Sequence, residues 1–338
     1  MSKQPFISVV MICYNYGHLL PRSLGAIARQ TFRDFEIVFV DNGCTDNSVE
    51  VVNSFMAEHP DIPVRVVTVE KNQGLAHGDN VGTAAAIGKY ILLNDADDWM
   101  DDNTLEILAK TAIETDADRV IGSFRDVNDD GKVVKVRNVG KKPIMWLHTM
   151  QQANLFRTEI YHKNNIQLEC FWNDAEKCVR FSQYVKKVAF VQEPCYNYLV
   201  HTDSFSRKEL YKRLWNEKES LDLLMSKFRM VYDALDDQEN RDWEAYQAIR
   251  IYFFYTFQYL RDAPLKFKFE NYSRLQQIME KHFPDYWKNP HLSLFEQQGD
   301  SFTSKLAFWC LAKFERLHLI KPFLVFFHML CKLTYFHF

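Results

Sequence analysis

Apolar runs alternate with helix-like patterns along the first third of the chain. Runs rich in β-branched residues predict buried strands at residues 7–13, 35–40, 64–69 and 90–93. Between them, apolar residues recur at the spacing of a helix face, which predicts helices at residues 18–30, 46–58 and 74–86. This alternation is typical of a mostly parallel sheet covered by helices on both faces, so we expect an α/β fold.

The pattern changes after residue 116. Two further strands, at residues 119–124 and 133–136, flank the turn-forming stretch Asn128-Asp129-Asp130-Gly131 and predict an antiparallel addition to the sheet. A helix at residues 173–184 and short strands at 188–191 and 196–200 follow. Beyond about residue 206 the pattern is helical almost to the end. We therefore expect a first domain at residues 1–206, divided near residue 115, and a helical region at 207–338.

Composition narrows the class of protein. The chain of 338 residues is long enough for two domains, and its hydrophobic fraction of 47% is that of an ordinary soluble protein. A formal net charge of -3 gives no general attraction to nucleic acid, which is not an expected partner. The seven cysteines form no CxxC pair, and the N-terminus shows no signal peptide. We expect reduced thiols in a cytoplasmic protein.

Four polar loops follow the four predicted strands, at residues 14–17, 41–46, 72–74 and 94–98. In parallel α/β sheets, ligands bind beyond the carboxyl ends of the strands, so these loops predict one shared site. The first loop carries neither a GxGxxG fingerprint nor a P-loop, which argues against a nicotinamide-binding Rossmann domain and against an ordinary phosphate cradle.

The fourth loop is rich in acid. Asp95 and Asp97 are two residues apart directly after a strand, a spacing that can turn both carboxylates to one side. Close carboxylates repel unless a cation lies between them, and Mg²⁺ or Mn²⁺ accepts such oxygen ligands. Asp101 and Asp102 directly precede a helical pattern, where acids are favoured by capping and by the helix dipole. The cluster thus predicts a cation or nucleotide site first and a helix cap after it.

The stretches "ISVVMICYNYGHLLPRSLGAIARQTFRDFEIVFVDNGCTDNS" and "NQGLAHGDNVGTAAAIGKYILLNDADDW" resemble the opening and the D-x-D-D segment of family 2 glycosyltransferases. The resemblance extends roughly from Pro5 to Arg207. It implies the GT-A fold, with a helical C-terminal region behind it, and transfer of a sugar from a nucleoside diphosphate donor with inversion. On this basis residues 1–115 bind the donor and residues 116–206 hold the acceptor side.

The resemblance also implies roles for single residues. Cys13 and Tyr14 border the nucleobase, Asn42 lies where a base-recognising acid is common, Asp95 approaches the ribose, and Asp97 binds the Mn²⁺ or Mg²⁺ that bridges the pyrophosphate. The other donor-side candidates in the matching segments are Asn72, Gly74, Asn80 and Ala96. The stretch "EPCYNYLVHTDSFSR" resembles the segment that closes over the diphosphate, which makes His201 and Ser204 candidate phosphate contacts.

The acceptor hydroxyl needs a general base. Members of the family keep it in a Glu-Asp pair at a helix start, and here Asn173-Asp174 occupies that place within "LECFWNDAEKCVRF". The resemblance therefore implies that Asp174 is the catalytic base, with Glu169 and Glu176 as the next candidates. Taken by itself, an acid at this position is also a good N-cap.

Three positions depart from the family pattern. Asn42 replaces an acid, Asp79 stands where an Arg is frequent, and Leu199 replaces an Arg after the second Tyr of the closing segment. A neutral Asn42 can still pair with a base through its amide. The two missing cations leave the diphosphate without its usual partners, and Lys89, Arg125 and Arg207 are the candidates to replace them.

The last segment, residues 301–338, is basic and aromatic. It contains Lys305, Lys313, Arg316, Lys321 and Lys332 against the single acid Glu315. Its longest stretch without Lys or Arg is too short to span a bilayer, which takes about 20 apolar residues. Such a segment can lie in a membrane interface or pack on the protein core. A lipid-linked acceptor would make a peripheral position on the inner face of the cell membrane useful.

Together these features predict a metal-dependent glycosyltransferase. We expect it to move a sugar from a UDP-hexose or UDP-N-acetylhexosamine to a hydroxyl of a glycan or lipid-linked acceptor in the synthesis of a surface polysaccharide or glycolipid. The alternative is a sugar-nucleotide-binding protein that has lost catalysis through its altered loops. Nucleotidyl transfer is weaker, because no Gly-rich loop with a cation follows the first strand. The donor sugar, the acceptor, the linkage and the oligomeric state are left open.

Overall fold

A computed structural model describes residues 4–140, 145–170, 173–200, 218–257, 263–295 and 300–333. The chain divides into two compact units, one formed by residues 1–201 and the other by residues 202–338. The predicted boundary near residue 206 lies outside the described residues.

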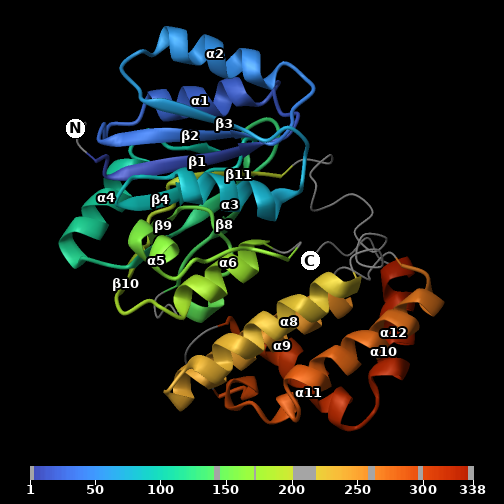
Figure 1. Cartoon of the computed structure of the whole chain (residues 1–338). Coiled ribbons are helices and arrows are strands. Elements are labelled where there is room, and N and C mark those ends of the chain that lie inside the picture. The colour runs from blue at the N-terminus through green and yellow to red at the C-terminus, as the bar shows by residue number, and fades with distance from the viewer. Residues whose placement is uncertain are drawn as a thin grey trace. The chain divides into compact units, whose positions relative to one another are not determined.

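Within the described part of the first unit, seven strands form the main sheet in the order β10-β6-β9-β4-β1-β2-β3. All neighbours are parallel except β9, which runs antiparallel to both β4 and β6. The strands are β1 (Ile7–Cys13), β2 (Phe35–Asp41), β3 (Val64–Thr68), β4 (Tyr90–Leu93), β6 (Arg119–Gly122), β9 (Asn154–Arg157) and β10 (Val188–Val191). The α/β class with a mostly parallel sheet is confirmed, as Figure 1 shows.

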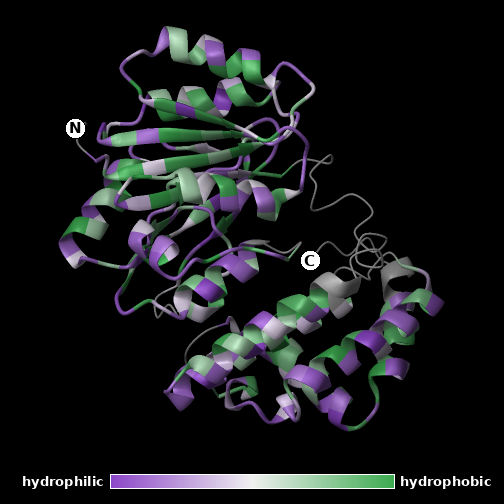
Figure 2. Ribbon diagram, in the orientation of Figure 1, coloured by the Kyte–Doolittle hydropathy of each residue, from purple (hydrophilic) through white to green (hydrophobic). Residues whose placement is uncertain are grey.

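Helices cover both faces of this sheet because successive strand residues point to opposite sides. Val9 belongs to the core shared with one set of helices, and Val10 to the core on the other face. The first set comprises α1 (Leu20–Ala28), α2 (Ser48–Glu58) and α4 (Thr104–Thr115). The second set comprises α3 (Leu75–Ala85), α5 (Thr158–Lys163) and α6 (Asn173–Ser182). Figure 2 shows the hydrophobic residues concentrated along the strands between these layers.

Helix α3 lies unusually close to β1 because two of its residues are glycines. A Cβ atom added at Gly82 would lie 2.5 Å from Cγ1 of Val10, and one at Gly78 would lie 2.7 Å from Cγ2 of Ile12. Larger residues would therefore push the helix away from the sheet. The close approach fixes the start of α3, and with it the loop at Gly74, at the carboxyl edge of the sheet.

One predicted strand was wrong in its extent. The pattern at residues 119–124 predicts a single strand, but the chain leaves the main sheet after β6 and enters a second sheet with β7 (Phe124–Val127). Ser123 marks the switch, since its amide and its hydroxyl both donate to the carbonyl of Val191. The predicted hairpin is present, but it belongs to this second sheet.

Within the described residues the second sheet has four strands in the order β5-β11-β7-β8. The remaining members are β5 (Trp99–Met100), β8 (Val133–Arg137) and β11 (Tyr196–Leu199). Strand β5 comes directly after the acidic loop, and β11 pairs with it antiparallel. The small sheet therefore holds the C-terminal end of the acidic loop in place through the pairing of β5 with β11.

The second unit is helical, as predicted. Its helices are α8 (Lys218–Ala234), α9 (Gln238–Phe257), α10 (Leu265–His282), α11 (Phe302–Arg316) and α12 (Ile320–Leu333), with short 3-10 turns at Tyr286–Lys288 and Pro290–Leu292. The buried carboxylate of Glu315 accepts hydrogen bonds from the hydroxyls of Tyr252 (2.5 Å) and Tyr272 (2.7 Å). Across the described residues, no helix combines the length and the hydropathy that a bilayer crossing requires.

Glu244, on α9, is completely buried, and neither of its carboxylate oxygens has a hydrogen-bond partner among the described residues. Burial raises the pKa of Glu244 well above its usual range. In the unfolded chain this group loses its proton at its ordinary pKa, while the folded unit keeps it. The free energy of unfolding should therefore fall as the pH rises above the usual Glu range.

Replacing Glu244 by Leu should flatten this dependence and raise the free energy of unfolding by about 1–3 kcal/mol near neutral pH, the usual cost of an unpaired buried polar group. Urea unfolding at a series of pH values measures both effects. Exposed Glu239 on the same helix, replaced by Leu, is the matched control. A Glu244→Leu protein with unchanged pH dependence would contradict the role given to this carboxyl group.

Candidate functional site

The loops after β1, β2 and β3 meet at the carboxyl edge of the sheet. The side chain of Asn42 is buried, and its Nδ2 donates to Oδ1 of Asn72 (3.3 Å) and to the carbonyl of Gly74 (3.2 Å). Its Oδ1 is buried without a hydrogen-bond partner among the described residues. Asn42, Asn72 and Gly74 thus form one unit that presents an amide oxygen as an unused acceptor.

The first loop is held in place by side-chain contacts. Cys13 is buried at the end of β1, and its backbone carbonyl accepts from the backbone N–H of Asn42 (3.0 Å). Tyr14 is exposed next to it, which leaves its ring available to stack on a ligand. Oδ1 of Asn15 accepts from the amide of Thr45 (2.8 Å), which fastens this loop to the one after β2.

The acidic loop after β4 contains three carboxylates with different surroundings. Both oxygens of Asp95 accept hydrogen bonds, from Nε2 of Gln151 (2.9 Å) and from Nε2 of Gln152 (2.9 Å). Asp98 is fully buried and accepts from the Leu199 amide (2.8 Å) and the Tyr196 hydroxyl (3.0 Å). Asp98 therefore ties the loop to β11, and its pKa is raised well above the usual range, first by burial.

Asp97 lies half-buried between these two, and Ala96 beside it is buried. Burial, together with the charges of Asp174 and Asp97, raises the pKa of Asp95 to about 8. Burial also raises the pKa of Tyr16 to about 12, again with contributions from Asp97 and Asp95. The charge of Asp97 therefore contributes to the raised pKa of Asp95, after burial and the charge of Asp174.

The residues fit a divalent cation. A cation near Asp97 would relieve its repulsion with Asp95, and Mg²⁺ needs only one or two carboxylates when phosphate oxygens complete its shell. The described residues contain no group of three or more His, Cys, Asp or Glu side chains arranged for a metal ion. Asp97 as the metal ligand stays a prediction.

Asp174 lies in the first turn of α6 and is half-buried. Burial raises the pKa of Asp174 to about 6, while the nearby Lys177 lowers it and Asp79 raises it. Because the charge of Asp174 also acts on Asp95, the predicted base and the donor-side carboxylate lie at the same edge of the sheet. A carboxylate with a pKa near 6 is ionised at neutral pH and can accept a proton.

The two other candidates for the base have different surroundings. Glu176 is fully buried, and its Oε2 accepts from the amides of Glu169 (2.8 Å) and Cys170 (2.8 Å). Glu176 therefore shapes the segment before α6, while Glu169 is exposed. Asn80 has a similar part, since its amide group makes two hydrogen bonds to the backbone of Leu168. Contact of Asn80 with the donor stays a prediction.

Two of the predicted cations lie within the described residues. Lys89 precedes β4, near the rings of Phe6 and Tyr90 at the opposite edge of the sheet. Arg125 pairs with Asp101 (2.8 Å). Among the described residues, two cations that the sequence did not indicate also contact this region. Lys177 on α6 pairs with Asp79, and Nη2 of Arg22 on α1 donates to the carbonyl of Asp97 (3.1 Å).

Three further expectations can be compared with the described residues. Asp101 and Asp102 precede α4 but do not cap it, since they pair with Arg125 (2.8 Å) and Arg29 (3.0 Å) instead. The predicted side-chain cap was therefore wrong. Leu199 is buried in β11, where its backbone amide donates to Oδ1 of Asp98. His201 and Ser204, and likewise Arg207, lie outside the described residues.

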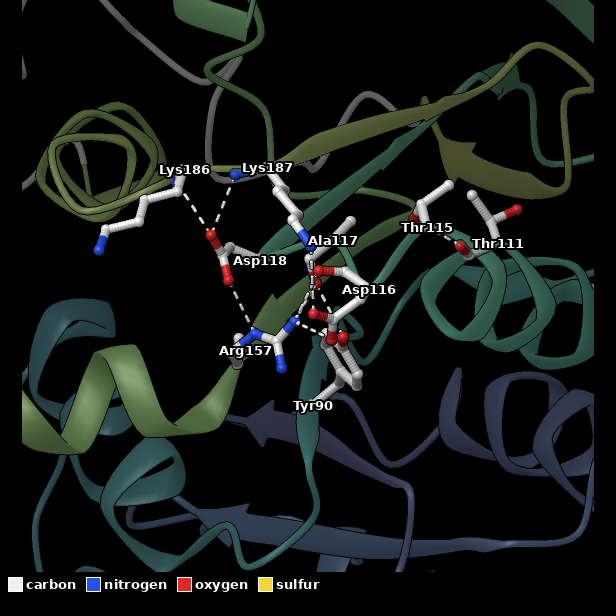
Figure 3. Close-up of polar contacts among 9 residues, drawn as sticks. All are labelled: Tyr90, Thr111, Thr115, Asp116, Ala117, Asp118, Arg157, Lys186 and Lys187. Atoms are coloured by element: carbon white, nitrogen blue, oxygen red, sulfur yellow. Dashed lines mark hydrogen bonds and ion pairs between the residues drawn. The ribbon is translucent and has the colours of Figure 1, made fainter.

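A second charged cluster lies at the opposite, amino-terminal edge of the sheet. Figure 3 shows Arg157 pointing between Asp116 and Asp118, with ion-pair distances of 2.9 Å and 2.8 Å. Asp118 also accepts from the backbone amides of Lys186 (2.9 Å) and Lys187 (3.0 Å). These contacts join the starts of β6 and β10 to the end of β9, and they indicate a structural role.

Gln151 and Gln152 are the functional candidates that the sequence did not reveal. They directly precede β9, and because β9 is antiparallel, its first residues lie at the carboxyl edge of the parallel strands. The sequence feature that could have revealed them is the short apolar run at residues 155–156, if it is interpreted as a strand antiparallel to its neighbours. Two apolar residues are too few to predict such a strand.

Comparison with known proteins gives a consistent picture. The family model described as "Glycosyl transferase family 2" matches residues 8–174. The glycosyltransferase GlyG of Streptococcus pneumoniae is 30% identical over 60% of this chain and 73% of its own length. The hyaluronan synthase of Pasteurella multocida is 24% identical over 62% of this chain, which covers only 22% of that enzyme.

Solved structures agree on the fold. The S. aureus protein TarS (residues 1–349), in complex with UDP-GlcNAc, superposes with a TM-score of 0.71 at 17% identity, over 98% of this chain and 93% of that one. The mannosyltransferase PcManGT of Pyrobaculum calidifontis, in complex with GDP-Man and Mn²⁺, gives a TM-score of 0.54 at 14% identity, with coverage of 98% and 88%.

Proposed function

The chain belongs to glycosyl transferase family 2, and from this premise we propose that it is an inverting enzyme that uses a UDP-hexose or UDP-N-acetylhexosamine. The acceptor is a hydroxyl of a glycan or a lipid-linked sugar. The observation that carries the proposal is the meeting of the Asn42 amide, the carboxylates of Asp95 and Asp97, and Asp174 at one sheet edge. Relatives that synthesise hyaluronan and chondroitin support a glycan product.

The choice of nucleobase rests on Asn42. Its Nδ2 is already used by Asn72 and Gly74, so its buried Oδ1 needs a donor from the ligand. The ring N–H of uracil supplies such a donor, whereas the ring nitrogen of cytosine at the same place is an acceptor. An unpaired buried acceptor would cost about 1–3 kcal/mol, which favours UDP over CMP donors. TarS bound to UDP-GlcNAc supports the same choice.

The chain's own residues divide the chemistry. Asp174 takes the proton of the attacking acceptor hydroxyl, Asp95 orients the donor, and Asn42 holds the base. A divalent ion at Asp97 would stabilise the negative charge on the leaving diphosphate. Lys177 and Arg22 add positive charge near the acidic loop at residues 94–98, whose own charged side chains are all carboxylates.

A donor panel tests the function. The protein is incubated with UDP-, GDP-, CMP- and TDP-sugars, with and without Mn²⁺, and released nucleotide is measured in the presence of glycan acceptors. Release from UDP-sugars alone is the expected result. Binding of UDP without release under all conditions would support the alternative, a sugar-nucleotide-binding protein without catalysis. Release only from CMP-sugars would overturn the role given to Asn42, because the ring nitrogen of cytosine is an acceptor and cannot donate to its Oδ1.

We also propose that the C-terminal helices contact an anionic membrane surface. The apolar side chains of Phe302, Leu317 and Phe326 on these helices are exposed to 65%, 60% and 53%. Exposed Arg316 and Lys321 lie within a few residues of them. Apolar groups beside cations suit the headgroup region of an anionic bilayer.

Replacing Leu317 and Phe326 by Ser should reduce binding to vesicles of mixed neutral and anionic lipid about a hundredfold or more in a sedimentation assay. Each apolar side chain contributes about 1.5–3 kcal/mol when buried, and about 1.4 kcal/mol corresponds to a tenfold change in affinity. Deletion of residues 301–338 is less suitable, since it also removes the buried Glu315 and Leu311. The matched control replaces exposed Ile113 and Val134 of the first unit by Ser. Equal vesicle binding by the wild type, the Leu317/Phe326 variant and the control variant would refute the membrane proposal.

A further inference from the structure

Lys177 is a fully buried lysine within α6. Its Nζ donates to Oδ1 of Asp79 on α3 (3.1 Å) and to Oε1 of Gln151. Burial by itself lowers the pKa of Lys177, but the charges of Asp79 and Asp174 raise it by more, so the pKa lies above its usual value. An ammonium group in this position is charged at neutral pH and has hydrogen donors only.

The donors of Lys177 decide how Gln151 is oriented. A side-chain amide offers an oxygen on one side and an NH₂ group on the other. Because Lys177 can only donate, Gln151 must turn its oxygen toward Lys177 and its NH₂ toward Asp95. The observed contact from Nε2 of Gln151 to Oδ1 of Asp95 (2.9 Å) is the result. With the amide reversed, two oxygens would face each other and repel.

The neighbouring glutamine completes this arrangement. Nε2 of Gln152 donates to Oδ2 of Asp95 (2.9 Å), so the two oxygens of this carboxylate are held by two different amides. Gln151 and Gln152 are both buried. The plane of the Asp95 carboxylate is therefore fixed by a short chain of contacts that begins at Asp79 and Lys177.

The pair with Lys177 also explains why an acid can stand at position 79. A carboxylate at the start of α3 would repel a diphosphate if it faced the donor, but Asp79 is buried and paired with Lys177. The pair joins α3, next to the nucleotide loops, to α6, which carries Asp174. The reversed charge at position 79 and the lysine at position 177 thus belong together.

We propose that Lys177 is a positioning residue that sets the amide of Gln151, and through it holds the carboxylate of Asp95 in the orientation that binds the donor. This inference rests on the proposed function, because Asp95 is taken to bind the nucleotide sugar. Lys177 itself need not touch the substrate.

The test compares Lys177→Met, Gln151→Leu and the double variant. For each, the Kd of UDP is measured by calorimetry, KM and kcat by nucleotide release, and stability by thermal unfolding. Each single variant should weaken UDP binding about tenfold, within the 10–100-fold range typical for the loss of an outer partner of a binding group. The double variant should bind UDP no more weakly than the single variant with the higher Kd, since both changes interrupt one chain of contacts.

Lys187→Met is the matched control, because Lys187 is exposed and pairs with Asp116 at the opposite edge. A Lys177→Met protein that unfolds at lower temperature but keeps the wild-type Kd would overturn the proposal, as would additive losses in the double variant. If Lys177→Met does not fold, Gln151→Leu decides, since it leaves the Asp79–Lys177 pair in place: an unchanged Kd then rejects the idea. Absence of nucleotide release by the wild type would instead count against the proposed function, because UDP binding needs no turnover.

Discussion

Replacing Asp174 by Asn is expected to lower kcat by about 10²–10⁴-fold while leaving the affinity for UDP within a factor of a few. Loss of a positioned general base costs a rate factor of this size. The side-chain volume is retained, and Asn at this position still suits the first turn of a helix. Nucleotide release under saturating donor, together with calorimetric UDP binding, measures the two effects separately.

The pH dependence of kcat/KM provides a second test of Asp174 as the base. The base must be ionised, so kcat/KM should rise with pH, with a midpoint near the pKa of about 6 given to Asp174 by burial. Lys177 lowers this pKa, while Asp79 raises it. The midpoint should therefore move to higher pH in Lys177→Met. Wild-type turnover by Asp174→Asn would place the base on another residue.

Replacing Asp97 by Ala should remove the part of the UDP affinity that depends on Mn²⁺ or Mg²⁺. Losing a ligand should cost at least as much as losing one of its outer partners, which is about 10–100-fold in metal affinity. Titrations of UDP with and without Mn²⁺ measure this difference directly. In the wild type the two affinities should differ, and in Asp97→Ala they should coincide.

Asp102→Ala is the matched control for this prediction. Asp102 belongs to the same acid-rich stretch, but it is largely exposed and pairs with Arg29. Its removal should leave the metal dependence intact. If Asp97→Ala kept the full effect of Mn²⁺ on UDP binding, the metal assignment would be wrong, and the charge on the diphosphate would depend on cations of the chain such as Arg22.

Much of the donor side could be predicted because it depends on local pattern. The strands that end at Cys13, Asp41 and Leu93 are buried apolar runs, and parallel strands bring their following loops to one edge. The meeting of the loops at Asn42 and Asp95 follows from these two facts. The family resemblance then directed attention to Asp97 and Asp174 within that edge, where their roles remain to be tested.

The partners of these residues could not be predicted in the same way. Lys177 meets Asp79 across 98 positions of sequence, and Gln151 meets Asp95 across 56. Neither contact follows from a period of two or 3.6 residues, since the first depends on two helices packed on the same sheet face. The second depends on β9 running against its neighbours, which its short apolar run does not announce.

The sequence by itself therefore determined the α/β sheet, the sheet edge at which the polar loops gather, and the acids that follow β4. The tertiary structure alone decided which charges pair. Asp79 pairs with Lys177, both oxygens of Asp95 accept hydrogen bonds from glutamines, and Asp101 and Asp102 pair with arginines instead of capping a helix. The physical reason is that strand and helix formation depend on local spacing, whereas a buried charge is stable only with the partner that packing brings to it.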